Sequence, residues 1–248
     1  MALVIGTGFT QLQSIDSELA DALKAAAEVT VALDHYHHRR PNFPALVDIV
    51  DAANETQHKL LSLQQSIPLE PRRTDCLRSM CLSAALIYSD MILFPLPAVC
   101  EVKPRLARNL RHAMEKFDML KADEGTSDNQ EESAEDYALL TLWILMLGRL
   151  ATEFTADSLY FIQKLRQYFS RVSYIGTWQD FSNVMATYLW WDYIFDEPSE
   201  KLWLEVYMTL PSTTRQGALL TTRDEDSPYS RIWITSPLPS QGIPPAVE

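Results

Sequence analysis

The sequence predicts an all-α protein, a multi-helix bundle or α-array of about eight helices with an extended, partly disordered C-terminal tail. Apolar residues recur at steps of three and four along most of the chain as far as residue 208, which is the helical period. Glycine is scarce, with 7 residues that lie almost entirely between or outside these periodic segments. This scarcity also disfavours Rossmann and P-loop folds, which need glycine where the backbone approaches phosphate.

The first two helices are expected in the segment before Pro68. Ser14 can cap the first helix, which ends near Arg40, where a basic side chain suits the helix dipole. Asn42 opens the second helix, and Pro44 is tolerated in its first turn. The inner face of this second helix is predicted to carry side chains at helical spacing: Phe43, Leu46, Val50, Ala53, Gln57 and Leu60.

The third and fourth helices each carry one clear apolar stripe. Thr74 caps the third helix and Pro95 ends it. The fourth helix spans residues 102–120 and has a basic face: Lys103, Arg105, Arg108, Arg111 and Lys116. This face is interpreted as solvated, or as paired with the acidic segment that follows it. A nucleic-acid contact is the alternative, although phosphate repels a chain whose net charge is −12.

The middle of the chain combines a polar segment with strongly apolar ones. Residues 123–136 are rich in carboxylates and contain no basic residue, which predicts a mobile acidic loop. Residues 137–151 are apolar nearly all round, so we expect this helix at the centre of the protein. The helix at 155–170 is predicted to turn four side chains inward: Leu159, Ile162, Leu165 and Phe169.

Two more helices complete the predicted domain. Thr177 caps one that runs from Trp178 to Phe195, and Pro198 or Ser199 starts a short last helix to about residue 207. Residues 1–208 are therefore expected to form a single helical domain. Prolines punctuate residues 209–248, which predicts the extended or disordered tail, with 230–235 as a candidate short strand.

Composition argues for an intracellular protein. Cys76, Cys81 and Cys100 suit neither a disulfide framework nor zinc-ligand spacing, so we interpret them as free thiols and expect no metal or cofactor. The N-terminus lacks the basic region and cleavage site of a signal peptide. The longest apolar run, residues 137–147, falls short of the ~20 residues that cross a bilayer, so no membrane span is expected.

Two polar clusters invite a metal interpretation, and each has a simpler structural one. The first lies at a predicted helix end, where adjacent side chains diverge and cations suit the dipole: His35, His37 and His38. The second could hold Mg²⁺ from one helix face: Asp192, Asp196 and Glu197. A facing acidic constellation is missing, since Asn183 is the only candidate nearby, and these carboxylates also fit helix capping. No catalytic residue is therefore assigned.

The most distinctive feature is an aromatic segment between residues 178 and 203. At helical spacing such rings are usually core, and each buries roughly 150–250 Å². The rings expected to build either the core or a ligand pocket are Trp178, Phe181, Tyr188, Trp191, Phe195 and Trp203. The choice between a filled core and an open pocket near Trp190, Trp191 and Phe195 is the main question that the sequence leaves open.

This segment resembles the C-terminal end of the fungal-specific transcription factor domain, the large helical domain attached to zinc binuclear cluster DNA-binding modules. The resemblance is carried by Trp178-x-x-Phe181, Tyr188-Leu189-Trp190-Trp191-Asp192, Phe195-Asp196-Glu197 and Leu202-Trp203-x-x-Val206. The run from Leu139 to Gly148 is similar to an upstream helix of that domain. The resemblance covers roughly residues 75–207.

The resemblance implies a nuclear regulatory domain that acts through protein–protein interaction. Many members of that family accompany secondary-metabolite pathways. The closely spaced cysteines of its DNA-binding module are missing from this chain, so we do not expect direct DNA binding. The expected partners are other proteins, either a regulator or a second copy of this chain. The alternative function is an all-helical enzyme or small-molecule binder with an aromatic pocket near Trp190, Trp191 and Phe195.

Overall fold

A computed structural model of the chain describes residues 5–66, 68, 71–97, 100–123, 137–153, 155–170, 172 and 175–209. All of these residues belong to one compact unit. The predicted acidic loop from residue 124 onward, the predicted tail from residue 210 onward and the candidate strand at 230–235 lie outside the described residues.

The all-α prediction is confirmed, because the described residues form helices and no strand. In chain order these are a 3₁₀-helix η1 (Thr7–Ser14), α1 (Ser17–His37), α2 (Leu46–Gln65), α3 (Arg73–Ile92), α4 (Val102–Asp123), α6 (Ala138–Ala151), α7 (Ser158–Phe169), α8 (Trp178–Met185) and α9 (Asp192–Tyr207). Among them, none has both the length and the apolar character needed to cross a membrane.

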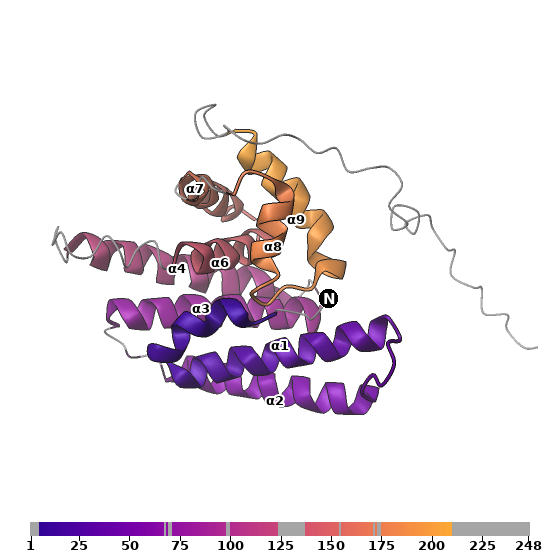
Figure 1. The fold of residues 1–248 in the computed structure, drawn as a ribbon. Helices are drawn as coiled ribbons and strands as arrows, with labels where there is room; N and C mark the ends of the chain where they lie inside the picture. The colour runs from indigo at the N-terminus through magenta and orange to yellow at the C-terminus, as the bar shows by residue number, and fades with distance from the viewer. Residues whose placement is uncertain are drawn as a thin grey trace, which may run out of the picture. The chain divides into compact units, whose positions relative to one another are not determined.

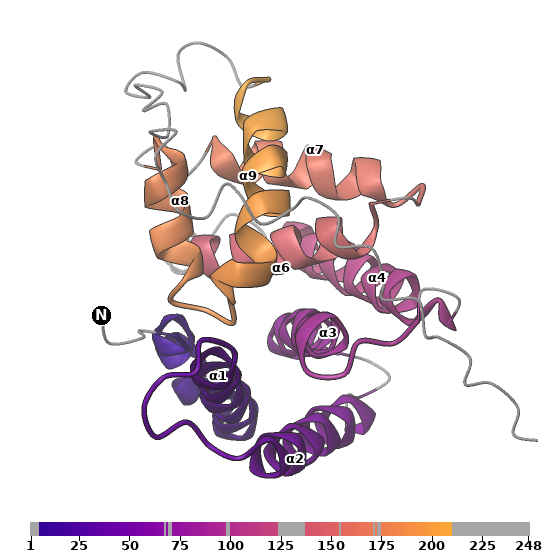
Figure 2. The ribbon, with the colours of Figure 1, turned by 90° about the vertical axis from the view of Figure 1, so that its right-hand side faces the viewer.

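The helices pack mainly against their neighbours in sequence. Helix α1 lies on η1 and α2, and α3 packs against α2 on one side and α4 on the other. Helix α6 packs on α3, α4 and α7. Figures 1 and 2 place α7, α8 and α9 together, on the opposite side of α6 from α1 and α2. The Trp-rich segment therefore belongs to the layer farthest from α2.

Helices α3 and α6 form the centre of the protein. Every residue from Leu140 to Gly148 is buried in α6, as the sequence predicted, and α3 is buried continuously from Met80 to Asp90. Gly148 allows α7 to approach closely, since a Cβ at this position would lie 2.4 Å from Cε1 of Phe161. Apolar burial on this scale is the dominant stabilising term for a domain of this size.

The first two helices begin later than the sequence predicted. Asp16, and not Ser14, caps α1, because its Oδ1 accepts the backbone N–H of Leu19 at 3.0 Å. Ser14 instead ends η1, a short helix that the sequence analysis did not anticipate. Helix α2 begins at Leu46 because Asn42 has a φ of 60° and Pro44 disfavours helical backbone in the residue before it.

The predicted inner face of α2 is wrong in its first half. Phe43, Leu46 and Val50 are 43%, 49% and 44% exposed. The buried side chains of α2 are Ile49, Ala53, Thr56 and Leu60. Ile49 and Ala53 pack with Val29 of α1. Two apolar stripes with helical spacing therefore run along the start of this helix, and spacing alone does not say which one is buried.

The inward orientation predicted for Leu159 is also wrong, since this side chain is 67% exposed. The buried residues of α7 are Phe161, Ile162, Leu165 and Phe169, three of which follow the predicted stripe. Leu159 lies in the first turn of the helix, before the first buried residue, Phe161.

The last two helices divide at a different place from the one predicted. Thr177 caps α8 as expected, with its Oγ1 accepting the N–H of Asp180 at 3.1 Å. The chain then leaves the helix after Met185 and re-enters at Asp192, so Pro198 lies inside α9. The break has a tertiary cause. The carbonyls of Thr187 and Leu189 accept bonds from the Gly8 amide and the Trp143 indole, at 2.8 and 2.9 Å.

Candidate functional site

The six aromatic residues singled out in the sequence do not surround one common space. Trp178 lies against Phe181 and Trp203, with ring centroids 5.6 and 6.4 Å apart, so these three rings hold α8 to α9. Tyr188 stacks at 5.9 Å on Trp143 of α6. These contacts direct the rings to different helices of the domain.

The remaining rings point to two further helices. Phe195 stacks on Tyr88 of α3 at 5.6 Å and contacts Trp190 at 4.9 Å. Trp191 instead faces the end of α1, where its indole N–H donates to Asp34 at 3.3 Å. Phe181, Tyr188, Trp190, Phe195 and Trp203 are buried, and Trp178 and Trp191 are half-buried. The rings thus fill space between helices.

The three histidines lie at the C-terminal end of α1, where His37 and His38 meet the start of α9. Asp34 is 3% exposed and receives Arg40 Nη2 at 2.8 Å and His38 Nδ1 at 3.0 Å. The ring of His37 packs on Tyr193 at a centroid distance of 4.1 Å. A buried carboxylate is costly unless it is paired, and Arg40, His38 and the Trp191 indole supply those partners. The cluster therefore closes the C-terminal end of α1 against α9.

The carboxylates considered for Mg²⁺ are engaged in local interactions at α9. Asp196 accepts the Trp190 indole N–H at 3.2 Å, and Glu197 binds Lys201 at 2.7 Å. Asp192 accepts the N–H of Tyr193, but Trp191 is the N-cap of α9 and makes no capping bond, so the capping predicted for these carboxylates is wrong. Asn183 bonds to Gln179 on the exposed side of α8. Within the described ranges, no group of three or more metal-binding side chains occurs.

The basic face predicted on α4 is divided by ion pairs. Arg111 binds Glu115 and also Asp157, each at 2.8 Å. Lys103 lies 3.7 Å from Asp90, whose side chain is buried in α3. Arg105, Arg108 and Lys116 are exposed. Part of the basic face therefore serves packing, and the acidic segment with which it was also predicted to pair lies outside the described residues from position 124 onward.

The cysteines are free thiols, as the sequence predicted. Burial raises the pKa of the Cys76 and Cys81 thiols, which keeps both in the neutral, weakly reactive form. Cys100 is exposed.

The feature that sequence analysis missed is an exposed apolar surface at the start of α2. We call it the α2 face and define it by Tyr36, Phe43, Leu46, Val47 and Val50. Val47 is 63% exposed, and the rings of Tyr36 and Phe43 contact each other at 5.5 Å. Helical spacing places Leu46, Val47 and Val50 side by side. The signal was present in the sequence as a second apolar stripe, and it was assigned to the core.

Comparison of the chain with protein-family models, with curated proteins and with solved structures finds no match.

Proposed function

We propose that this chain is a helical regulatory module that acts by binding another protein through the α2 face. The observation that carries the proposal is the exposure of that face: Leu46, Val47 and Val50 are 49%, 63% and 44% exposed on three adjacent positions of a helix. Single exposed apolar residues are ordinary, whereas a group of them on one surface marks a contact site.

The α2 face offers enough apolar surface to hold a partner helix. Burying a Val, Leu or Phe side chain completely contributes roughly 1.5–3 kcal/mol. About half of the side-chain surface of Phe43, Leu46 and Val50 is exposed and can be buried by a partner. Tyr36 adds a ring at one end of the α2 face. An amphipathic helix that presents apolar residues at steps of three and four can lie along such a surface.

The charges beside the α2 face define the partner further. Asp48 and Asp51 are exposed on α2, on the side of Val47 that lies away from the buried stripe. Acidic side chains along one border of an apolar contact favour a partner with basic residues in the matching position. The partner that fits is an amphipathic helix with lysines or arginines along one edge.

The proposed cellular setting is transcription regulation in the nucleus. Its support is the resemblance of residues 75–207 to the fungal transcription factor domain, together with a chain whose cysteines do not have the spacing of that family's DNA-binding module. In this setting the chain reaches its target through a partner that binds DNA. The aromatic rings do not favour the enzyme alternative, because they contact one another and the core.

A tethering experiment tests this function. The full chain is fused to an unrelated DNA-binding module, and transcription of a reporter gene is measured in a fungal host. We expect the fusion to change reporter transcription and Val47→Glu to return it to the level of the DNA-binding module alone. Placing a carboxylate in an apolar contact costs on the order of 1.4 kcal/mol or more, which is a tenfold loss of affinity.

The matched control is Leu159→Glu, which makes the same kind of change at a side chain that is 67% exposed on α7. It should leave the reporter response unchanged. Light scattering on the purified chain checks for self-association: a dimer that Val47→Glu converts to a monomer would replace the basic helix with a second copy of the chain. A response that Val47→Glu and Leu159→Glu leave equally intact contradicts the proposal.

A further inference from the structure

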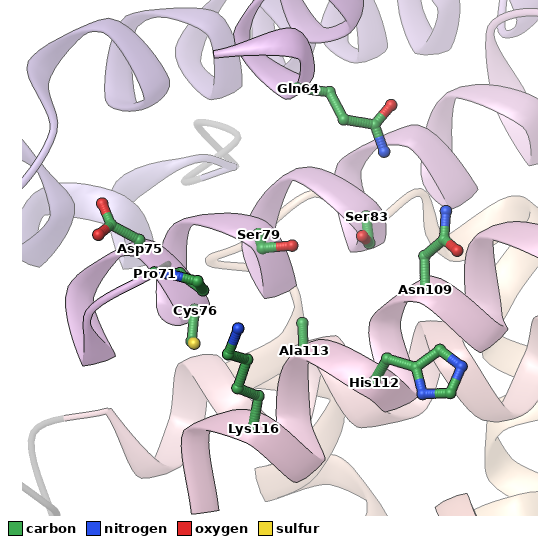
Figure 3. Close-up of a pocket in the computed structure, with 10 residues that line it drawn as sticks. All are labelled: Gln64, Pro71, Asp75, Cys76, Ser79, Ser83, Asn109, His112, Ala113 and Lys116. Atoms are coloured by element: carbon green, nitrogen blue, oxygen red, sulfur yellow. The ribbon is translucent and has the colours of Figure 1, made fainter. Parts of the chain in front are cut away.

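A second feature lies on a different surface, between the end of α2, the first half of α3 and the middle of α4. It is a groove with a volume of about 290 Å³. Figure 3 shows the residues that line it, several of which carry hydrogen-bonding side chains: Gln64, Pro71, Asp75, Cys76, Ser79, Ser83, Asn109, His112, Ala113 and Lys116. The volume is at the lower end of the roughly 300–1,000 Å³ range of ligand pockets, so it suits a small molecule.

The serine hydroxyls in the groove make no bond to a carbonyl of their own helix, a property that they share with the buried Ser89 and Ser199 hydroxyls. Thr30, Thr141 and Thr152 each bond to the carbonyl four residues earlier, at 2.8 to 2.9 Å. Among the described residues, neither Ser79 nor Ser83 makes such a bond. Ser83 is 1% exposed and lines the groove, so its hydroxyl is buried and directed at a space that a ligand can occupy.

Two carboxamides complete the set of available hydrogen-bonding groups. Gln64 extends from the end of α2 and Asn109 from α4, toward the same space above Ser83 (Figure 3). Neither side chain bonds to another described residue. Each carboxamide can donate and accept, so this end of the groove matches hydroxyl or amide groups of a ligand.

The other end of the groove carries a cation. The Lys116 side chain extends from α4 toward Cys76 (Figure 3), and within the described ranges it has no carboxylate partner. Glu115, its neighbour, is occupied by Arg111 at 2.8 Å. Asp75 is engaged at the start of α3, where its Oδ2 accepts the Arg72 N–H at 2.9 Å. Among the described residues, Lys116 therefore offers an unpaired ammonium group to an anionic ligand group, in a groove that the Asp75 carboxylate also lines.

We propose that this groove binds a small carboxylate that also carries hydroxyl or amide groups. The carboxylate pairs with Lys116, and the polar remainder bonds to Ser79, Ser83 and the two carboxamides. The Cys76 thiol forms part of the floor and stays protonated, since burial raises its pKa more than Lys116 lowers it. The site therefore binds its ligand and carries out no thiol chemistry.

NMR titration of the full, isotope-labelled chain tests this site with three probes. D-Gluconate supplies a carboxylate with hydroxyls, L-glutamine a carboxylate with an amide, and glycerol hydroxyls without charge. We expect at least one of the two carboxylates to shift the amide signals of residues 76–83 and 109–116 saturably, with a Kd of about 1 mM. Added salt should weaken this binding. Glycerol should produce no saturable shift.

Two variants locate the contact. Lys116→Gln should weaken carboxylate binding about tenfold, the loss expected for a charge-assisted hydrogen bond. Asn109→Ala removes an exposed carboxamide with no risk to the core and should also weaken it. The matched control is Lys59→Gln, which removes an exposed lysine of α2 that pairs with Glu55.

The results of the titration test the groove independently of the α2 face. Binding of gluconate alone identifies a hydroxy acid, and binding of glutamine alone identifies an amino-acid-like carboxylate; both support the proposal. It is overturned if neither carboxylate saturates, if glycerol binds equally well, or if Lys116→Gln binds like Lys59→Gln. Val47→Glu should bind the carboxylate normally, so the groove and the proposed function can fail independently.

Discussion

Helices α6 and α2 both carry many apolar side chains, but those of α6 are buried and several of those of α2 are exposed. Helix α6 is buried on all sides between α3, α4 and α7, with Trp143 at its centre. Helix α2 packs on α1 and α3 through Ile49 and Leu60 and leaves a second apolar stripe, the α2 face, open. The comparison teaches that apolar side chains in this protein serve two purposes, and that burial alone separates them.

The largest effect is expected from Trp143→Ala in α6. This side chain is fully buried, and its indole donates to the Leu189 carbonyl at 2.9 Å. Removing it should reduce the free energy of unfolding by about 3–5 kcal/mol, because a cavity forms and a buried carbonyl loses its donor. Urea unfolding followed by circular dichroism measures the change. Trp143→Phe keeps most of the packing and should cost clearly less; equal losses would show that the cavity is unimportant.

A smaller effect, of opposite sign, is expected from Asp90→Asn in α3. Burial raises the pKa of the Asp90 carboxyl above its usual 3.8, although Lys103 opposes this shift. The folded chain therefore holds this proton more tightly than the unfolded chain, so stability falls as pH rises from just below 4 through the folded pKa. At neutral pH the buried charge on Asp90 lowers the free energy of unfolding, and the neutral side chain of asparagine removes this penalty.

Asp90→Asn should accordingly raise Tm at pH 7 by about 2–4 °C, the shift that ~1 kcal/mol produces in a domain of this size. The difference should shrink as the pH is lowered toward 4. The control is Asp192→Asn, at an exposed carboxylate. A lower Tm for Asp90→Asn at pH 7 would mean that the Lys103 pair outweighs the burial of the charge.

The smallest effect is expected from Val50→Glu on the α2 face. Val50 is 44% exposed, so the free energy of unfolding should change by no more than about 0.5 kcal/mol. Ile49, the preceding residue, is 3% exposed, and Ile49→Glu should be strongly destabilising because it buries an unpaired charge. Thermal unfolding of the two variants gives the comparison at adjacent positions. Similar losses for both would place the second stripe in the core.

The sequence predicted helices well where one apolar stripe or one buried surface existed. Each of helices α3, α4 and α6 has only one apolar surface to bury, so periodicity and prolines located them, although α3 is capped at Arg72 and not, as predicted, at Thr74. Periodicity failed in α2, where two stripes compete, and it failed at residues 186–191. There the Thr187 and Leu189 carbonyls bond to Gly8 and Trp143, which are distant in sequence. Long-range partners of this kind leave no trace in local spacing.

The sequence identified the aromatic residues, but it did not show that their rings contact different helices. Trp191 turns to Asp34 of α1 while Phe195 turns to Tyr88 of α3, and only the packing of the helices decides this. The groove was equally hidden, since Gln64, Ser83 and Asn109 are ordinary polar residues on three different helices until the fold brings them together.

The most direct test of the account is covalent footprinting of the purified full chain with a small carbene probe, read residue by residue by mass spectrometry. The account predicts strong labelling of Leu46, Val47 and Val50 and little labelling of Ile49, Trp143, Trp190 and Trp203. Protection of the α2 face in a monomeric chain, or strong labelling of Trp190 and Trp203, would contradict it.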